Sequence, residues 1–365
     1  MTPTAKPVSN FVRGLMSSPW LHPLNDLDAL DDLVGCFDET WSLTRTKARV
    51  IAVVCETADA CTLVLRPNRL WPGHVAGQHV LVEVEIDGRR VCRTFTISSP
   101  PRADGTIAIT VKRRAGGKLS VWWNERAAVG AVLGLGAPAG DFVLPAGKHE
   151  RIAMLSAGSG ITPVMAIVRT LREQAPDTSV LFVHSARSRE DVIFRHELEE
   201  MARRWHGFDL RLQLTGTDGR LDAAALSRLA QTVGSDLTFA CGPSDFLEAA
   251  NRAWREAGNQ ERLRSEHFGL RSSIAAGDRS APQCVRAERA GVSFVAAGGK
   301  SLLVEAEAAG LNPAYGCRMG ICHTCKCRKV SGIVEDLRDG RVSGEPDEMI
   351  QLCVSAAKSA LTLEL

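Results

Sequence analysis

The pattern of apolar and polar positions changes near residue 150 and divides the chain into two kinds of region. Before that point, short runs with apolar residues at every second position are separated by turn sequences, which is typical of β-strands. Asp87-Gly88 and Asp104-Gly105 each separate two runs and favour hairpins. Many short strands with Gly and Pro turns predict a small β-barrel. The runs cover residues 48–55, 61–66, 79–86, 93–98 and 106–112.

From residue 151 onward, short apolar runs alternate with segments of helical periodicity. Strand–helix alternation of this kind predicts a parallel, doubly wound sheet covered by helices. The helices are expected to end near residues 174 and 204, with a third over 223–230. The predicted strands cover residues 152–156, 180–184, 209–215 and 237–241.

Changes in composition predict where these regions begin and end. Residues 1–45 form an extension with a capped short helix over 25–33, and residues 271–282 form a polar linker that contains Gly and Ser. We therefore expect an extension over 1–45, a β-barrel over 46–147, an α/β domain over 148–270, the linker over 271–282, and a last domain over 283–365.

Composition narrows the class of protein. The net charge of the 365 residues is only +2, so charge gives no case for nucleic-acid binding. No run approaches the roughly 18 apolar residues that span a bilayer, and no signal peptide precedes the 11 cysteines. A disulfide-rich secreted scaffold is therefore not expected, and a reducing cytoplasm is the expected location.

Four cysteines near the C-terminus have a distinctive spacing. Three follow the pattern C-x4-C-x2-C, and the fourth comes after a gap of 27 residues. This spacing is typical of a plant-type [2Fe–2S] cluster held by four thiolates. A zinc site and plain buried thiols are the alternatives. Gly316 and Gly320 suit the loop, because backbone N–H groups must turn toward the sulfurs. The four expected ligands are Cys317, Cys322, Cys325 and Cys353.

Two motifs of the barrel region favour a flavin. In Arg93-Thr94-Phe95-Thr96, the Arg could bond a pyrophosphate, the ring could stack on an isoalloxazine, and Thr96 could hydrogen-bond flavin N5. A half-buried strand without a ligand would show the same alternation. Gly116-Gly117-Lys118-Leu119-Ser120 is a Gly-rich turn before a helix expected near residues 121–123. Such a turn can hold an anion, or it can be a hairpin end with an N-cap Ser.

Three further motifs follow strands of the parallel sheet, where nucleotides bind. Gly158-Ser159-Gly160-Ile161-Thr162-Pro163 stands where a pyrophosphate would lie, with Pro163 expected at the first helical position; a tight turn is the alternative. His184-Ser185-Ala186-Arg187-Ser188-Arg189 ends the next strand without an acid for a ribose 2′-OH. Its Ser185, Arg187 and Arg189 could hold a 2′-phosphate, which favours NADPH, although surface Arg residues are common. Cys241-Gly242-Pro243 ends the last predicted strand.

Together these motifs resemble the ferredoxin–NADP reductase superfamily with a C-terminal ferredoxin domain. The family patterns R-x-Y-[ST], G-x-x-S, G-x-G-x-[ST]-P and C-G-P match four of these five motifs in order, all except His184–Arg189, and E-x-F matches Glu266-His267-Phe268. The resemblance covers about 46–365. Phe95 replaces the usual Tyr, so the ring can stack but cannot donate a hydrogen bond. The phosphate turn lacks the form of the FMN-binding branch, so FAD is expected. The N-terminal part, with Trp20 and Trp41, resembles reductases that serve acyl-CoA desaturases.

The resemblance implies a six-stranded antiparallel flavin-binding barrel, a doubly wound parallel nucleotide domain and a β-grasp ferredoxin domain. It implies an NAD(P)H:acceptor oxidoreductase in which hydride reaches FAD and single electrons leave through the [2Fe–2S] cluster. Thr96, Cys241 and Glu266 would lie at the nicotinamide. The residues implied to bind FAD or nucleotide are Arg93, Thr94, Phe95, Thr96, Val111, Gly116, Gly117, Lys118, Leu119, Ser120, Gly158, Ser159, Gly160, Ile161, Thr162, Pro163, Ser185, Arg187, Arg189, Cys241, Gly242 and Pro243.

The partner that receives the electrons is left open by the sequence. A diiron desaturase or hydroxylase, which could be membrane-bound, is favoured. A soluble oxygenase, of the ring-hydroxylating or phenylacetyl-CoA type, and a hybrid-cluster protein are alternatives. A [2Fe–2S] redox sensor is an alternative of another class, although a sensor needs no hydride donor. Trp20 and Leu21 could touch a membrane-bound acceptor or pack on the barrel.

Overall fold

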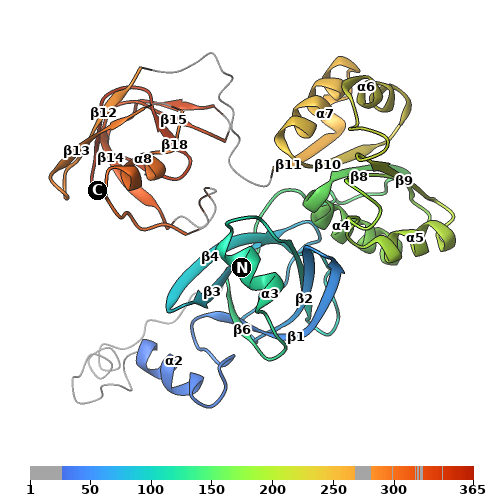
Figure 1. Ribbon diagram of the computed structural model, residues 1–365, viewed down its shortest axis with the longest axis horizontal. Helices are drawn as coiled ribbons and strands as arrows, with labels where there is room; N and C mark the ends of the chain where they lie inside the picture. The colour runs from blue at the N-terminus through green and yellow to red at the C-terminus, as the bar shows by residue number, and fades with distance from the viewer. Residues whose placement is uncertain are drawn as a thin grey trace, which may run out of the picture.

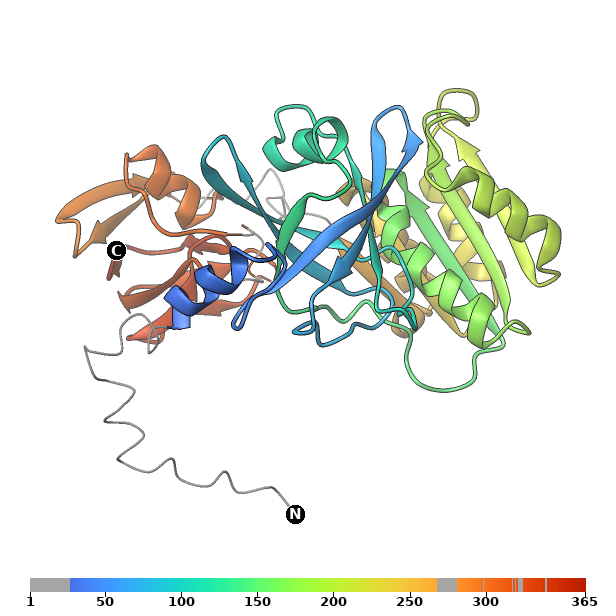
Figure 2. The ribbon, with the colours of Figure 1, turned by 90° about the horizontal axis from the view of Figure 1, so that it is seen from below.

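The fold was analysed in a computed structural model. The structure describes residues 27–267, 281–297, 299–316, 318, 320, 324–338 and 340–365. Most of the expected N-terminal extension and of the expected linker lie outside these ranges. A barrel occupies the middle, with a parallel sheet on one side and a C-terminal β-domain on the other (Figures 1 and 2). Among the described residues, no helix is long and apolar enough to cross a membrane.

A six-stranded antiparallel barrel follows the short helix α2 (Leu27–Gly35). Its strand order is β4-β3-β6-β1-β2-β5. A bridge between Ile97 and Ile109 joins the two edge strands and closes the barrel. The predicted barrel is confirmed, with one strand, β6, that the alternation pattern missed because it is only four residues long. The strands are β1 (Thr46–Thr57), β2 (Ala60–Pro67), β3 (His79–Ile86), β4 (Arg89–Thr96), β5 (Ile107–Lys112) and β6 (Val132–Leu135).

The turns and the core account for the barrel's shape. Asp87-Gly88 makes the predicted two-residue turn between β3 and β4, with both residues at positive φ. Asp104-Gly105 lies instead in a longer connection between β4 and β5. Inward-facing aliphatic side chains fill the barrel together with Trp123 from helix α3 (Lys118–Glu125), which is fully buried.

The sheet of the α/β domain has five parallel strands in the order β11-β10-β7-β8-β9. Helix α4 begins at Ile161, one 3₁₀ turn after β7, and its buried residues cover the sheet. Pro163 is therefore the third helical residue and not the first, which the helix tolerates because its first four N–H groups have no intrahelical acceptor. The strands are β7 (Arg151–Ala157), β8 (Ser179–Ala186), β9 (Phe208–Leu214), β10 (Leu237–Gly242) and β11 (Leu263–His267), and the helices are α4 (Ile161–Gln174), α5 (Arg195–Arg204), α6 (Ala223–Thr232) and α7 (Ser244–Glu256).

The C-terminal domain is the predicted β-grasp fold. A five-stranded sheet in the order β13-β12-β19-β14-β17 packs against helix α8 (Leu302–Ala308) through a core of its own. A second sheet has the order β16-β15-β18. The strands are β12 (Gln283–Ala287), β13 (Val292–Ala296), β14 (Lys326–Ser331), β15 (Val334–Asp336), β16 (Val342–Ser343), β17 (Glu348–Gln351), β18 (Ser355–Ala357) and β19 (Leu361–Leu363).

Candidate functional site

The end of strand β4 carries buried hydroxyls without a hydrogen-bond partner in the part of the chain that the structure describes. Thr94 Oγ1 and Thr96 Oγ1 are buried and have no hydrogen-bond partner among the described residues. Phe95 stands between them and packs against the Trp123 ring at 5.5 Å, while Arg93 donates to the Cys92 carbonyl. Because an unsatisfied buried hydroxyl is costly, these two atoms indicate a ligand with polar groups at this strand end.

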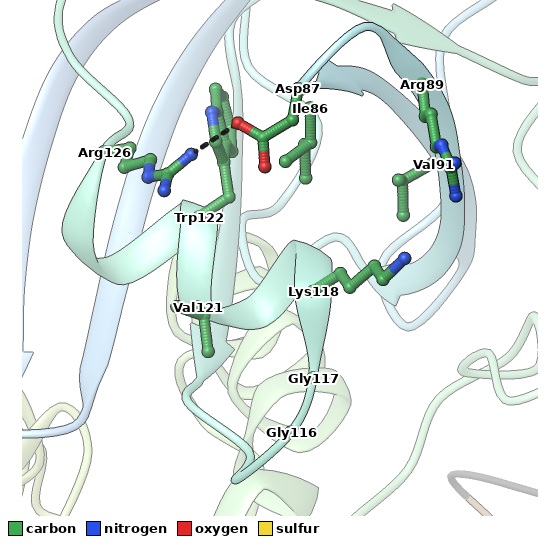
Figure 3. A pocket seen from close by; sticks show the side chains of 10 residues that line it. All are labelled: Ile86, Asp87, Arg89, Val91, Gly116, Gly117, Lys118, Val121, Trp122 and Arg126. Carbon is green, nitrogen blue, oxygen red and sulfur yellow. Dashed lines mark hydrogen bonds and ion pairs between the residues drawn. The ribbon is translucent and has the colours of Figure 1, made fainter.

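A pocket of about 480 Å³ lies beside the N-terminus of helix α3 (Figure 3). Gly117 precedes the helix, and a Cβ at this position would overlap Ser120 Oγ. Lys118 and Arg89 stand on one side of the pocket, and the Arg126–Asp87 ion pair on another. A helix N-terminus with cationic side chains favours an anionic group such as a pyrophosphate. The pocket is lined by Ile86, Asp87, Arg89, Val91, Gly116, Gly117, Lys118, Val121, Trp122 and Arg126.

The remaining expected flavin residues belong to helix α3 or contact it. Leu119 is buried in the barrel core, as is Val111, whose carbonyl accepts from the Asn124 amide at 3.1 Å. Ser120 Oγ accepts from the Arg114 backbone N–H at 3.2 Å. The unsatisfied threonines and the Gly-rich helix start fit FAD, which needs a hydroxyl at the isoalloxazine and an anion site at the pyrophosphate.

The Gly158–Pro163 motif forms the turn from β7 into α4. Gly158 has φ +54°, and Gly158–Gly160 make one 3₁₀ turn. A Cβ on Gly160 would overlap the backbone carbonyl of Cys241 in the neighbouring strand β10. Thr162 Oγ1 donates to the Ser159 carbonyl at 3.1 Å. The turn therefore lies directly against Cys241 and Gly242, while Pro243 caps α7.

Strand register aligns four polar or sulfur-bearing residues across the carboxyl end of the sheet. Ser156 of β7 pairs with both His184 of β8 and Cys241 of β10, and Cys241 pairs with Glu266 of β11. Ser156 Oγ and His184 Nδ1 share a hydrogen bond of 2.9 Å. The last of these four residues contacts the barrel, because Glu266 Oε1 lies 3.4 Å from His79 Nδ1 of strand β3.

Burial determines the protonation state of two of these four aligned residues. Burial, followed by the charge of Lys112, lowers the pKa of His184 to about 3, so the ring is neutral at pH 7. Burial, and then the nearby Glu266, raises the pKa of Cys241 well above its usual value. The Cys241 side chain is therefore a neutral thiol and not a thiolate nucleophile.

His79 is the residue of this site that sequence reasoning missed. Its ring lies against Gly140, whose φ of +112° and missing Cβ make room for it. His79 Nε2 and Glu266 Oε2 are both buried without a partner among the described residues. A signal was present, because the two-residue Asp87-Gly88 turn fixes the hairpin register and thereby pairs His79 with Thr96.

The basic residues expected at the adenosine end lie just beyond strand β8. Ser185 is buried, and its Oγ has no partner among the described residues. Arg187 contacts Asp191 at 2.7 Å and Asp59 of the barrel at 3.4 Å. Arg189 contacts Glu199 of α5 at 2.7 Å. Both arginine side chains are more than half exposed, so a ligand phosphate can reach them.

Two of the four expected cluster ligands are described, and they lie together. Cys325 and Cys353 are buried, and Gly320 N–H donates to Cys353 Sγ at 3.2 Å. Hydrogen bonds from the Cys353 thiol and from backbone N–H groups outweigh burial and lower the pKa of Cys325 to about 6. Thiolate-favouring N–H groups around sulfur fit a [2Fe–2S] cluster. Cys317 and Cys322 lie outside the described residues, as does Phe268 of the Glu266 motif.

Comparisons with known families account for all three parts of the chain. Residues 51–144 match an oxidoreductase FAD-binding domain, residues 154–252 an oxidoreductase NAD-binding domain, and residues 285–358 a 2Fe-2S iron-sulfur cluster binding domain. The expected cofactors FAD, NAD(P)H and [2Fe–2S] are therefore confirmed as classes, and the chain is an oxidoreductase of the ferredoxin reductase type.

Similar proteins share the whole arrangement. An NADPH oxidoreductase of Mycobacterium tuberculosis is 36% identical over 341 residues, which are 92% of this chain and 88% of that protein. A glycine betaine monooxygenase reductase subunit of Pseudomonas aeruginosa is 31% identical, over 96% of this chain and 100% of that protein. The structure of a phthalate dioxygenase reductase has the same fold, with a TM-score of 0.61 at 23% identity over 87% of this chain and 97% of that one.

Proposed function

This chain belongs to the family of electron-transfer reductases that combine an FAD-binding, an NAD-binding and a [2Fe–2S] domain, and we propose that it supplies electrons from NADPH to an oxygenase. When bound, FAD accepts a hydride from NADPH and releases electrons singly, and the [2Fe–2S] cluster carries them one at a time. The observation that carries the proposal is the 3.4 Å contact between His79 and Glu266 across the boundary, because His79 pairs with Thr96 in the barrel and Glu266 pairs with Cys241 in the sheet.

The protein's part in hydride transfer is to position the two reactants. The Gly158–Thr162 turn would hold the nucleotide pyrophosphate at the start of α4. Thr96 Oγ1 would hydrogen-bond the flavin, which would satisfy this buried hydroxyl. The neutral Cys241 side chain would pack against the nicotinamide without reacting with it. Positioning of this kind can supply much of the rate, because the cofactors carry the chemistry.

The same proposal assigns the residues that hold the other groups. Arg93 and the turn at Gly116 and Gly117 would hold the FAD pyrophosphate, with Lys118 as a further cation near it. The cluster would be held by Cys325 and Cys353 together with Cys317 and Cys322.

The electron acceptor is proposed at the level of its chemical class. The P. aeruginosa relative is a monooxygenase reductase subunit, and relatives at 28–31% identity include a reductase subunit of stachydrine N-demethylase and a subunit of 1,2-phenylacetyl-CoA epoxidase. These names favour an oxygenase as the partner. The acyl-CoA desaturase expected from the N-terminal part is a different class of electron acceptor, and reconstitution with each class of partner would separate the two.

An anaerobic titration tests the proposed electron path. NADPH added to the purified protein should bleach the flavin absorbance and then the cluster absorbance. A cluster that is bleached by dithionite but by neither nicotinamide nucleotide would contradict the path from NADPH and would favour a redox sensor.

Replacing Thr96 with Val should slow flavin reduction by about a hundredfold, the lower end of the cost of losing one preorganised hydrogen-bond donor. The side chain keeps its shape and loses only the hydroxyl, so the barrel should stay folded. Stopped-flow absorbance under single-turnover conditions measures the rate. Thr170→Val is the control, because that hydroxyl already donates to the Ala166 carbonyl within α4. An unchanged rate in Thr96→Val would remove the hydroxyl from the mechanism.

Replacing Arg187 with Ala should lower kcat/KM for NADPH by about ten- to a hundredfold while leaving that for NADH nearly unchanged, because a charged hydrogen bond to the 2′-phosphate is lost. Steady-state assays with both nucleotides measure the ratio. Arg211→Ala removes an exposed arginine that pairs with Asp209 on β9 and serves as the control. Equal losses with both nucleotides would show that Arg187 does not read the 2′-phosphate.

A further inference from the structure

The tip of the β1–β2 hairpin reaches from the barrel to the adenosine end of the nucleotide sheet. β1 ends at Thr57 and β2 begins at Ala60, so Asp59 occupies the turn between them. In Figure 2 this hairpin, drawn in blue, runs up beside the parallel sheet. Asp59 Oδ2 lies 3.4 Å from Arg187 Nη2 across the boundary between the two sheets. A residue of the flavin barrel thus contacts the arginine proposed to read the nucleotide.

The Asp59 carboxylate is held in place on its own side of the boundary. Thr57 Oγ1 donates to Asp59 Oδ1 at 2.9 Å, and Lys112 Nζ lies 3.3 Å from the same oxygen. Strand register fixes Lys112 there, because it pairs with Ala60. The Asp59 side chain is only 22% exposed, which makes its charge less screened than that of a fully exposed group.

Arg187 is therefore shared between two carboxylates. Asp191 holds it from its own domain at 2.7 Å, and Ser188 Oγ in turn donates to Asp191 at 3.2 Å. Asp191 follows Arg187 by four residues and belongs to the same loop. Asp59 is different, because it belongs to the barrel and pairs with a second cation, Lys112. A 2′-phosphate that reaches Arg187 meets the negative charge of Asp59 as well as the positive charge of the arginine.

We propose that Asp59 is a specificity-determining residue that competes with the nucleotide 2′-phosphate for Arg187. Through Asp59, the flavin barrel weakens the binding of 2′-phosphorylated nucleotides relative to unphosphorylated ones. Neutralising Asp59 removes the competing charge and releases both Arg187 and Lys112 for the phosphate. This inference rests on one part of the proposed function, namely that the 2′-position of the adenosine lies beside Arg187.

Other contacts keep the hairpin docked when Asp59 is changed. Ala60 of the same hairpin is buried in the same apolar cluster as Phe194, which precedes helix α5. Arg169 of α4 donates to the Ser98 carbonyl of the barrel. An Asp59→Asn substitution therefore changes charge at the boundary without removing the contacts that hold the two sheets together.

Calorimetric titration of the holoprotein with adenosine 2′,5′-bisphosphate and with 5′-AMP tests the inference without any turnover. In Asp59→Asn, the bisphosphate should bind about fivefold more tightly than in the wild type, the effect of one partly screened charge, and 5′-AMP should bind as before. The gain should shrink in about 0.5 M salt, because the charges are partly exposed. Asp209→Asn is the control, since it makes the same charge change beside Arg211 on strand β9.

The outcomes separate this inference from the proposed NADPH preference. A wild type that binds the bisphosphate no better than 5′-AMP, with a gain of bisphosphate affinity in Asp59→Asn, would overturn the NADPH preference and support the role of Asp59. A wild type that prefers the bisphosphate, with no gain in Asp59→Asn, would overturn the role of Asp59 and leave the NADPH preference standing. A gain of equal size in Asp209→Asn, or for 5′-AMP, would overturn the specific competition at Arg187.

Discussion

Replacing Cys325 with Ser should abolish electron transfer to a one-electron protein acceptor, such as cytochrome c, while flavin-dependent reduction of ferricyanide by NADPH continues. The rate of transfer should fall by more than about a hundredfold. Loss of a residue that only hydrogen-bonds to a metal ligand already costs up to about that much, and Cys325 is a ligand itself. The reason is that a [2Fe–2S] cluster needs all four ligands, and Ser lacks the soft thiolate. Both activities are measured in the same preparation, together with the electron paramagnetic resonance signal of the reduced cluster.

Cys327→Ser is a matched control for this substitution. Cys327 is also buried and stands two residues further along, but its thiol donates to the Arg328 carbonyl, and burial raises its pKa to about 11. A protonated thiol at this spacing fits no cluster ligand set, so the cluster signal and both activities should persist. Equal loss of cytochrome c and ferricyanide reduction in Cys325→Ser would contradict a relay in which the flavin precedes the cluster.

Replacing Gly160 with Ala should abolish nucleotide binding and lower the free energy of unfolding by about 1–3 kcal/mol, the usual cost of overpacking. The new Cβ would overlap the carbonyl of Cys241, which belongs to strand β10. That strand cannot move aside easily, because it pairs with β7 on one side and with β11 on the other. The Gly158–Thr162 turn must shift instead, and with it the start of α4. Urea unfolding and calorimetric titration with adenosine 2′,5′-bisphosphate and NADPH measure the two effects.

Gly219→Ala separates loss of stability from loss of the site. Gly219 has φ +73° and open space around its Cα, so Ala there adds backbone strain of about 1–2 kcal/mol without a clash. The protein should lose stability and keep its nucleotide affinity. If Gly160→Ala bound NADPH as tightly as the wild type, the turn after β7 would not be the pyrophosphate site.

Local signals in the sequence predicted the barrel and the parallel sheet, and the family resemblance added the number of barrel strands and the β-grasp domain. Alternation at every second position predicts barrel strands, and strand–helix alternation predicts a parallel sheet, because each pattern reflects which side of a single element is buried. The spacing of the C-terminal cysteines predicts the cluster without knowledge of the fold. Strands β6 and β11 were missed because they are four and five residues long, and β11 carries polar residues on the edge of its sheet.

Residues of the site could be predicted from the sequence only where they belong to a motif of consecutive residues. Thr96, Cys241 and Glu266 were named from such motifs, but nothing local predicts the His79–Glu266 contact that links their strands. That contact depends on the strand order β11-β10-β7-β8-β9, which is set by the crossover connections, and on the docking of the barrel against the sheet.

The sequence by itself thus determined the barrel, the parallel sheet and the [2Fe–2S] cluster, because turns, periodicity and ligand spacing are short-range properties of the chain, and its family motifs added FAD and the β-grasp domain. The tertiary structure decided that His79 stands beside Glu266 and that Asp59 reaches Arg187. Those pairs are 187 and 128 residues apart. Contacts at such separations are created by strand register and domain docking, and these depend on the packing of the whole chain.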